Sequence, residues 1–152
     1  VGGTVSGWHT LVIGRRVRDA LEQKAGKYGS IDMPFVIAVY GAGEWPVRTS
    51  NEFNALFGGS ELRVPTKGVG KPTWGRKPDG FFVSVREGKR HHEHVSAVLF
   101  YRFKWQNNGH EHQMHVYHNP FALKPLRPDL FPGIPQFVGD GEKLEWRNGK
   151  PE

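Results

Sequence analysis

The sequence contains no cysteine. This absence excludes disulfide bonds, thiolate nucleophiles and cysteine-based zinc sites, and it fits a reducing compartment. Long hydrophobic runs are missing too, because no apolar stretch approaches the roughly 20 residues that a membrane-spanning helix needs. The opening Val-Gly-Gly-Thr does not resemble a signal peptide. We therefore expect a soluble, cytoplasmic protein with no membrane partner.

Acidic residues are outnumbered, with 15 Asp and Glu against 21 Lys and Arg and a formal net charge of +6. A basic surface favours a polyanionic partner, and nucleic acid is the first candidate. Many basic proteins bind no nucleic acid, so the charge is a modest signal. No pattern in the sequence indicates an oligomeric state.

A chain of 152 residues corresponds to one domain of ordinary size. We expect this single domain to span residues 1–138. Residues 139–152 resemble a polar tail, with one weak strand around residues 144–146. The first residue is Val and the opening resembles a turn within a domain, so the sequence predicts the C-terminal part of a longer protein.

The fold is predicted around the apolar, β-branched run from Pro34 to Tyr40, which is typical of a central strand buried on both faces. Apolar residues at three- and four-residue steps predict a helix over residues 10–28. A second helix is expected over residues 50–57, where Thr49 and Glu52 have the spacing of a capping box. Together these elements predict an α/β or α+β fold, with a mixed sheet flanked by helices.

A β-hairpin is predicted over residues 95–118. Apolar residues alternate from Val95 to Trp105, Asn108-Gly109 is a favoured two-residue turn, and His110–His118 forms the returning strand. This turn would pair Trp105 with His112. Most apolar side chains then share one face of the hairpin, and the other face carries Arg102, Lys104, Gln113 and His115.

A basic segment lies between Arg63 and Arg90, where eight basic residues accompany two acidic ones and Trp74 stands in the middle. Basic side chains bind phosphates and tryptophan stacks on bases, so the segment is typical of a loop that follows a nucleic-acid backbone. The alternative is a solvated surface loop whose Trp74 packs into the core. The predicted nucleic-acid-binding residues are Arg15, Arg16, Lys67, Lys71, Trp74, Arg76 and Lys77.

Histidines form two groups. His91, His92 and His94 precede the long strand, and His110, His112, His115 and His118 lie on the returning strand. His110 and His112 project from one side of the returning strand, roughly 6.6 Å apart, which is a spacing that metal ligands can use. They lie beside an exposed turn, and the sequence places no acidic or cysteine ligand with them. We therefore interpret them as solvated strand histidines and assign no metal ligand. His118 is interpreted as a histidine at the edge of the core that is bonded to backbone.

The chain resembles a bacterial protein family of uncharacterised function, which we associate with the restriction-endonuclease-like PD-(D/E)XK nuclease fold. The resemblance covers roughly Arg15 to Phe131. The family usually has Asn where this chain has Tyr40. The segments that carry the resemblance are Lys24-Ala-Gly-Lys27-Tyr28-Gly29, Asp32-Met-Pro34-Phe-Val-Ile-Ala-Val39, Asn54-Ala-Leu-Phe-Gly58, Gly75-Arg-Lys-Pro-Asp-Gly-Phe81, Val95-Ser-Ala-Val-Leu99 and His118-Asn-Pro-Phe-Ala122.

The resemblance implies that residues 10–28 form the helix that follows the catalytic strands of such nucleases. The carboxylates that bind Mg²⁺ and the catalytic lysine would then precede Val1, so we identify no catalytic residue and no cofactor in this chain. Glu22-Gln-Lys24 has the letters of the Asp/Glu-x-Lys motif but lies within the predicted helix. Some nucleases of this fold carry Gln-x-x-x-Tyr on the equivalent helix, and Lys24 and Tyr28 have the same spacing.

These observations lead to three hypotheses. The first is the C-terminal part of a nuclease-like, nucleic-acid-binding protein that depends on Mg²⁺ only at full length, with Lys24, Tyr28 and His118 supporting the site from a distance. The second is a non-catalytic binding or structural domain whose basic loop contacts nucleic acid or a protein partner. The third is a histidine-based metal site on the hairpin.

Overall fold

The computed structural model describes residues 5–29, 31–41, 48–65, 70–139 and 143–151. Within these ranges, neither α-helix combines the length and the apolar character that crossing a membrane requires. The elements in chain order are α1 (Val5–Lys27), β1 (Val36–Gly41), α2 (Thr49–Phe57), β2 (Ser60–Arg63), β3 (Thr73–Arg76), β4 (Val85–Arg86), β5 (Lys89–Arg90), β6 (Ala97–Gln106), β7 (Gly109–His118), a 3-10 helix (Pro128–Leu130), β8 (Gln136–Gly139) and β9 (Leu144–Arg147).

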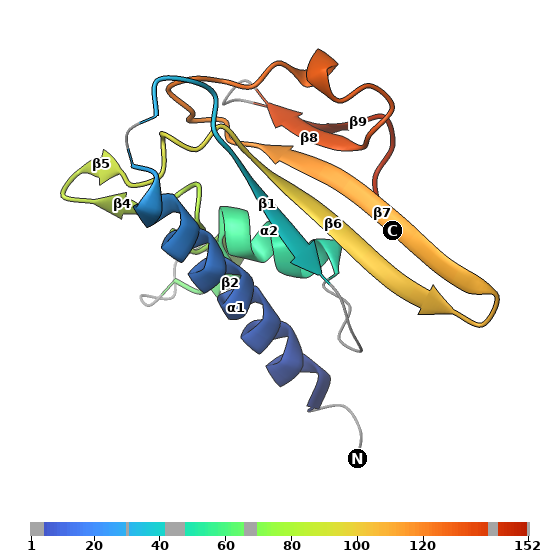
Figure 1. The fold of residues 1–152 in the computed structure, drawn as a ribbon. Helices are drawn as coiled ribbons and strands as arrows, with labels where there is room; N and C mark the ends of the chain where they lie inside the picture. Colours follow the sequence, from blue (N-terminus) through green and yellow to red (C-terminus); the bar gives the residue numbers. More distant parts are fainter. Residues whose placement is uncertain (1–4, 30, 42–47, 66–69, 140–142, 152) are drawn as a thin grey trace.

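Five strands form one mixed sheet in the order β1-β6-β7-β8-β9 (Figure 1). β6 is parallel to β1 and antiparallel to β7, and β8 is parallel to β7 and antiparallel to β9. The mixed α/β class predicted from the sequence is therefore confirmed. The segment 139–152, predicted as a polar tail, contributes β9 to this sheet.

Both helices pack against the same face of the sheet. On α1, Val17, Leu21 and Ala25 are buried at the spacing of one helical stripe. Strand side chains alternate between faces, and the register of β1 against β6 places Ile37 beside Val98 on the helix side. The shared core contains Val17, Leu21, Ala25, Ile37, Ala55, Leu56, Phe57, Phe81, Phe82, Val95, Val98, Phe100, Tyr117 and Phe137.

The prediction of a central strand buried on both faces is wrong for residues 34–40. In the described sheet β1 stands at one end and pairs with β6 alone. Ile37 is its only buried residue, and Tyr40 is 64% exposed. An apolar, β-branched run indicates that a strand forms, but its place in the sheet depends on pairing with segments far away in the sequence.

The predicted hairpin forms, but its turn and register differ from the prediction. Gln106 pairs with Gly109, so the turn residues are Asn107 and Asn108, and Trp105 lies opposite His110 rather than His112. Gly109 follows the turn with φ 136°. The register is shifted by two residues, and a shift of two leaves every side chain on its predicted face because side chains alternate with a period of two.

The hairpin face that carries the charged side chains is the one that packs under the helices. On this face Phe100, His115 and Tyr117 are buried. In the described part of the chain, neither α-helix covers the opposite face, which carries Tyr101 and Trp105. The interior therefore contains polar groups, and each of them needs a partner there.

Glu52 does not serve as the capping residue that its spacing predicted. Arg48 is the N-cap of α2, and its backbone N–H donates to Asn51 Oδ1 at 3.3 Å. Position 52 is one residue further into the helix and faces the sheet. The Glu52 side chain is fully buried there.

The Glu52 carboxylate joins α2 to β6 and β7. Arg102 Nε donates to Glu52 Oε1 at 2.8 Å, and the Tyr117 hydroxyl donates to Glu52 Oε2 at 3.1 Å. His115 Nε2 lies 2.5 Å from the same Oε2. Burial and the neighbouring carboxylate both raise the pKa of the Tyr117 phenol, so it stays a hydrogen-bond donor. Arg102 also donates to Thr49 Oγ1 at 3.1 Å.

We expect Glu52→Gln to lower the free energy of unfolding by about 3 kcal/mol, because the substitution leaves the Arg102 guanidinium without its carboxylate in the interior. Urea denaturation at neutral pH measures this change. Glu61→Gln is the matched control, since Glu61 forms an exposed pair with Arg63 at 2.7 Å, and a loss below about 1 kcal/mol is expected there. Equally small losses for both variants would contradict a role for Glu52 in holding α2 on the sheet.

Candidate functional site

A two-stranded ribbon overlaps the segment that the sequence predicted as basic, with β3 inside the segment and β2 at its start. β2 and β3 pair antiparallel, with Leu62 opposite Trp74. We call residues 60–63 and 70–80 the Trp74 ribbon. Trp74 is 76% exposed, so the alternative in which its ring packs into the core is wrong.

The base of the Trp74 ribbon is fixed against the end of α2 by close backbone contact. A Cβ on Gly58, which has φ 89°, would lie 1.9 Å from the carbonyl oxygen of Lys77. A Cβ on Gly80 would lie 2.2 Å from the backbone nitrogen of Gly58. No side chain fits at either position, so these two glycines let the ribbon join the core without a gap.

Arg76 contributes to the same attachment. Its Nη1 donates to the Gly58 carbonyl oxygen at 2.7 Å and to Asn54 Oδ1 at 3.2 Å, and its guanidinium lies 4.3 Å from the centre of the Phe53 ring. Burial lowers the pKa of Arg76, but a guanidinium remains charged at neutral pH. Arg76, which the sequence predicted to bind nucleic acid, therefore makes intramolecular contacts with α2 and with the residue that ends it.

The lysines of the Trp74 ribbon point outward. Lys71 and Lys77 are exposed, and in the described part of the chain neither ammonium group has an ion pair or a hydrogen bond. Lys67, which the sequence also assigned to nucleic-acid binding, lies outside the described residues. Two of the three predicted lysines are thus available beside Trp74.

Helix α1 borders the end of the Trp74 ribbon. Arg18 Nη1 donates to the Asp79 carbonyl oxygen at 2.7 Å and lies 3.7 Å from the Asp79 carboxylate. Arg15 and Arg16 are exposed on α1. Arg15 precedes Arg18 by three residues and is therefore on the same side of the helix. The fold thus brings one predicted arginine of α1 toward the ribbon.

The residues with predicted supporting roles do not share one site. Lys24 is exposed and Tyr28 packs its ring against Phe35 at 5.6 Å. His118 is buried, and its Nε2 lies 2.8 Å from Gln136 Oε1. It borders a cavity of about 300 Å³ that neither Lys24 nor Tyr28 lines. The predicted position of His118 at the edge of the core agrees with its burial.

An aromatic surface lies on the hairpin face opposite α1 and α2. Tyr101 stacks with Tyr40 at 5.6 Å, and Phe103 contacts Trp105 at 5.0 Å and His112 at 5.1 Å. Trp105 is 73% exposed. We call Tyr40, Tyr101, Phe103, Trp105, His110 and His112 the aromatic face. The sequence showed this alternation, but a period of two does not reveal which face of a sheet is covered.

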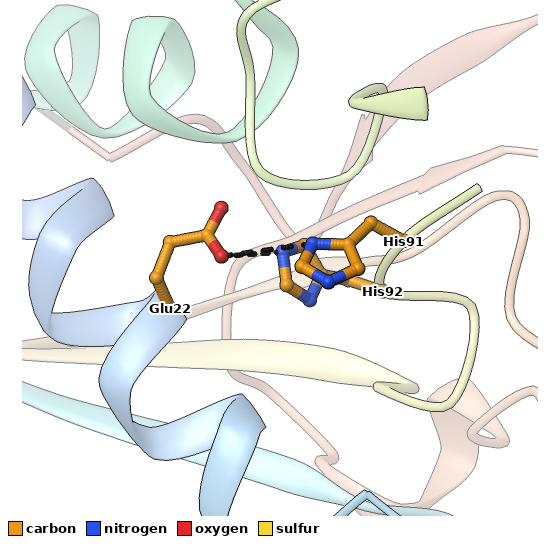
Figure 2. A group of neighbouring side chains, drawn as sticks. All are labelled: Glu22, His91 and His92. Atoms are coloured by element: carbon orange, nitrogen blue, oxygen red, sulfur yellow. Dashed lines mark ion pairs between the residues drawn. The ribbon is translucent and has the colours of Figure 1, made fainter. Parts of the chain in front are cut away.

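A second group of side chains comes together between α1 and the segment after β5 (Figure 2). Glu22 Oε2 lies 2.9 Å from His92 Nε2 and 3.8 Å from His91 Nδ1. His92 is 2% exposed and stacks on Phe81 at 4.0 Å. Burial lowers the pKa of His92, and the Glu22 carboxylate offsets this in part. The sequence grouped His91 with His92 but gave no indication that His92 is buried.

Sequence reasoning missed this cluster because its acidic member stands on α1, far from the histidines in the sequence. One ligand atom from each of Glu22, His91 and His92 lies within 4.8 Å of the others. A carboxylate and two imidazoles are ligands that zinc accepts. Only the packing of α1 against the segment after β5 brings them together.

Comparison with known proteins identifies no relative: no family model, curated protein or solved structure matches this chain. Function therefore has to be inferred from the geometry of these side chains and from the resemblance stated above.

The buried His118 predicts a loss of stability in mild acid. Burial lowers its pKa despite hydrogen bonds to Gln136 and the Leu126 backbone, and the charge of Arg147 lowers it further. As the pH falls through about 6.5, His118 therefore takes up a proton in the unfolded chain before it does so in the folded protein. The free energy of unfolding then decreases, by at most about 1.4 kcal/mol per pH unit for one histidine.

Urea denaturation at about pH 7.5 and pH 5.5 tests this expectation, because most carboxylates remain ionised over that range. His118→Gln retains a hydrogen-bonding side chain but cannot titrate. Its stability should depend less on pH than that of the unchanged protein. The same pH dependence in both proteins would show that His118 is not the titrating group.

Proposed function

We propose that this chain is the C-terminal part of a nuclease-like protein and binds nucleic acid through the Trp74 ribbon. The observation that carries the proposal is the exposure of Trp74, which is 76% accessible at the centre of a basic ribbon. A large aromatic ring loses favourable burial when it stands in water. A binding partner that covers the ring would recover this energy.

Nucleic acid is the partner whose chemistry fits both parts of the ribbon. A base stacks on an indole ring whatever its sequence, and Lys71 and Lys77 can bind the flanking phosphates. Arg15 on α1 adds positive charge near the end of the ribbon where Arg18 contacts Asp79. Stacking requires a base that is not already stacked on both sides, so the proposal favours single strands. Contacts of this kind give affinity with little sequence specificity.

The nuclease part of the proposal rests on the resemblance to the PD-(D/E)XK fold. That fold places the Mg²⁺-binding carboxylates ahead of the helix that corresponds to α1. Glu52 is a fully buried carboxylate of this chain, and its oxygen atoms already contact Arg102, His115 and Tyr117. It is therefore not placed to bind a metal ion together with a phosphate substrate. This chain would therefore contribute binding, and the preceding segment would contribute cleavage.

The gene upstream of Val1 tests the nuclease part. We expect it to encode an Asp, followed by Asp/Glu-x-Lys, on short apolar strands. The longer protein should cleave nucleic acid only with Mg²⁺, and this chain should not cleave. An upstream sequence without these residues would contradict the nuclease assignment and leave the binding proposal standing.

The aromatic face supports a second candidate, a non-catalytic domain that docks another protein. Trp105 and Tyr40 are mostly exposed there, and exposed aromatic patches of this kind often mark protein interfaces. This candidate uses the opposite side of the hairpin from the helices. The two surfaces can therefore be tested separately.

We expect Trp74→Ala to weaken binding to a labelled single-stranded oligonucleotide by about 5- to 160-fold, because one stacked base contributes about 1–3 kcal/mol. Fluorescence anisotropy at low salt measures the change. Trp105→Ala is the matched control, since it removes an equally exposed indole from the aromatic face. If only Trp105→Ala weakens binding, the aromatic face is the nucleic-acid surface. If the unchanged protein does not bind at low salt, the proposal fails.

A second prediction concerns the lysines. The double variant Lys71→Ala/Lys77→Ala should make the slope of log affinity against log salt shallower by about 1.4, because each phosphate contact to a single strand contributes about 0.7. The affinity should fall to a similar extent for oligonucleotides of different sequence. Lys24→Ala is the control, because this exposed lysine lies away from the ribbon on α1, and its slope should not change. A slope unaffected by the double variant would exclude phosphate contacts at these lysines.

A further inference from the structure

The cluster of Glu22, His91 and His92 contains buried nitrogen atoms without hydrogen bonds. Both ring nitrogens of His92 and Nδ1 of His91 are shielded from solvent and have no hydrogen-bond partner. His92 Nε2 lies 2.9 Å from the Glu22 carboxylate, but the contact lacks hydrogen-bond geometry. Buried polar atoms nearly always have a partner. Two of these nitrogens, His91 Nδ1 and His92 Nε2, lie beside the same carboxylate oxygen, and together they point to a missing ligand.

The distances between the potential ligand atoms suit a small divalent ion. Zinc binds imidazole nitrogen and carboxylate oxygen at about 2.0–2.2 Å, so tetrahedral ligand atoms stand about 3.4 Å apart. The two carboxylate–imidazole separations, 2.9 and 3.8 Å, lie on either side of this value. Figure 2 shows both imidazoles beside the Glu22 carboxylate. Small side-chain rotations would complete the geometry.

We propose that Glu22, His91 and His92 bind one zinc-like divalent transition-metal ion. Two imidazoles and one carboxylate select such an ion over Mg²⁺, which prefers oxygen ligands. His92 is held by its stacking on Phe81. Glu22 and His91 each remain about one third exposed, so the ion can enter from solvent and keep a water molecule as its fourth ligand.

The neighbouring His94 is not part of this ligand set. Its Nε2 lies 3.3 Å from the carbonyl oxygen of Ala25, and its ring centre is 6.0 Å from that of His92. The contact with Ala25 ties the segment after β5 to α1 independently of any metal. The bound ion would add a second tie between α1 and this segment, and this role is separate from nucleic-acid binding.

Isothermal titration of the chain without a histidine tag, after treatment with EDTA, tests the proposal. We expect one Zn²⁺ per chain, a higher unfolding temperature with Zn²⁺, and no competition from excess Mg²⁺. Co²⁺ should bind at the same stoichiometry and give the visible absorption of a four-coordinate site. If no zinc binds, the proposal is overturned.

Variants assign the site to these residues. Glu22→Gln keeps the shape of a partly exposed side chain, so this variant should fold. The substitution should weaken Zn²⁺ binding at least tenfold, because even residues beyond the direct ligands change metal affinity by about 10–100-fold. His91→Ala should have a similar effect. The matched control is His110→Gln/His112→Gln, which removes two exposed histidines of the aromatic face and should leave the affinity unchanged. Loss of binding in the control alone would overturn the assignment.

Discussion

The arrangement of the whole molecule depends on one buried carboxylate, Glu52. It is fully buried and is reached by Arg102 from β6 and by His115 and Tyr117 from β7. A charge in the interior is tolerated only when its partners are in place. The position and rotation of α2 on the sheet are therefore tied to the register of the hairpin.

The position of α2 in turn determines where the Trp74 ribbon stands. Gly58 ends α2 and meets the ribbon backbone, and Arg76 binds the Gly58 carbonyl while its guanidinium covers Phe53. The base of the ribbon is thus held in place, and β3 presents the exposed Trp74 beyond it. A fixed base with exposed side chains is what a binding surface needs, because little conformational freedom is lost when a partner is bound.

The net charge of +6 does not act as one basic surface. Arg18, Arg76 and Arg102 are engaged by Asp79, by α2 and by Glu52 respectively. Lys71, Lys77, Arg15 and Arg16 face solvent. Composition counts all of these residues alike, but the side chains of the second group are the ones that the described contacts leave unengaged. The proposed partner is accordingly inferred from a smaller set of residues than the sequence indicated.

The sequence by itself determined the local elements, because helical spacing and strand alternation report which side chains a short segment can bury together. It thereby predicted α1, α2, the hairpin and its division into two faces. The tertiary structure decided the rest. It placed β1 at the end of the described sheet, turned the charged face of the hairpin inward, moved Glu52 from a cap to the core, and brought Glu22 to His91 and His92. Each of these outcomes depends on contacts between segments far apart in the chain, and local periodicity carries no information about such contacts.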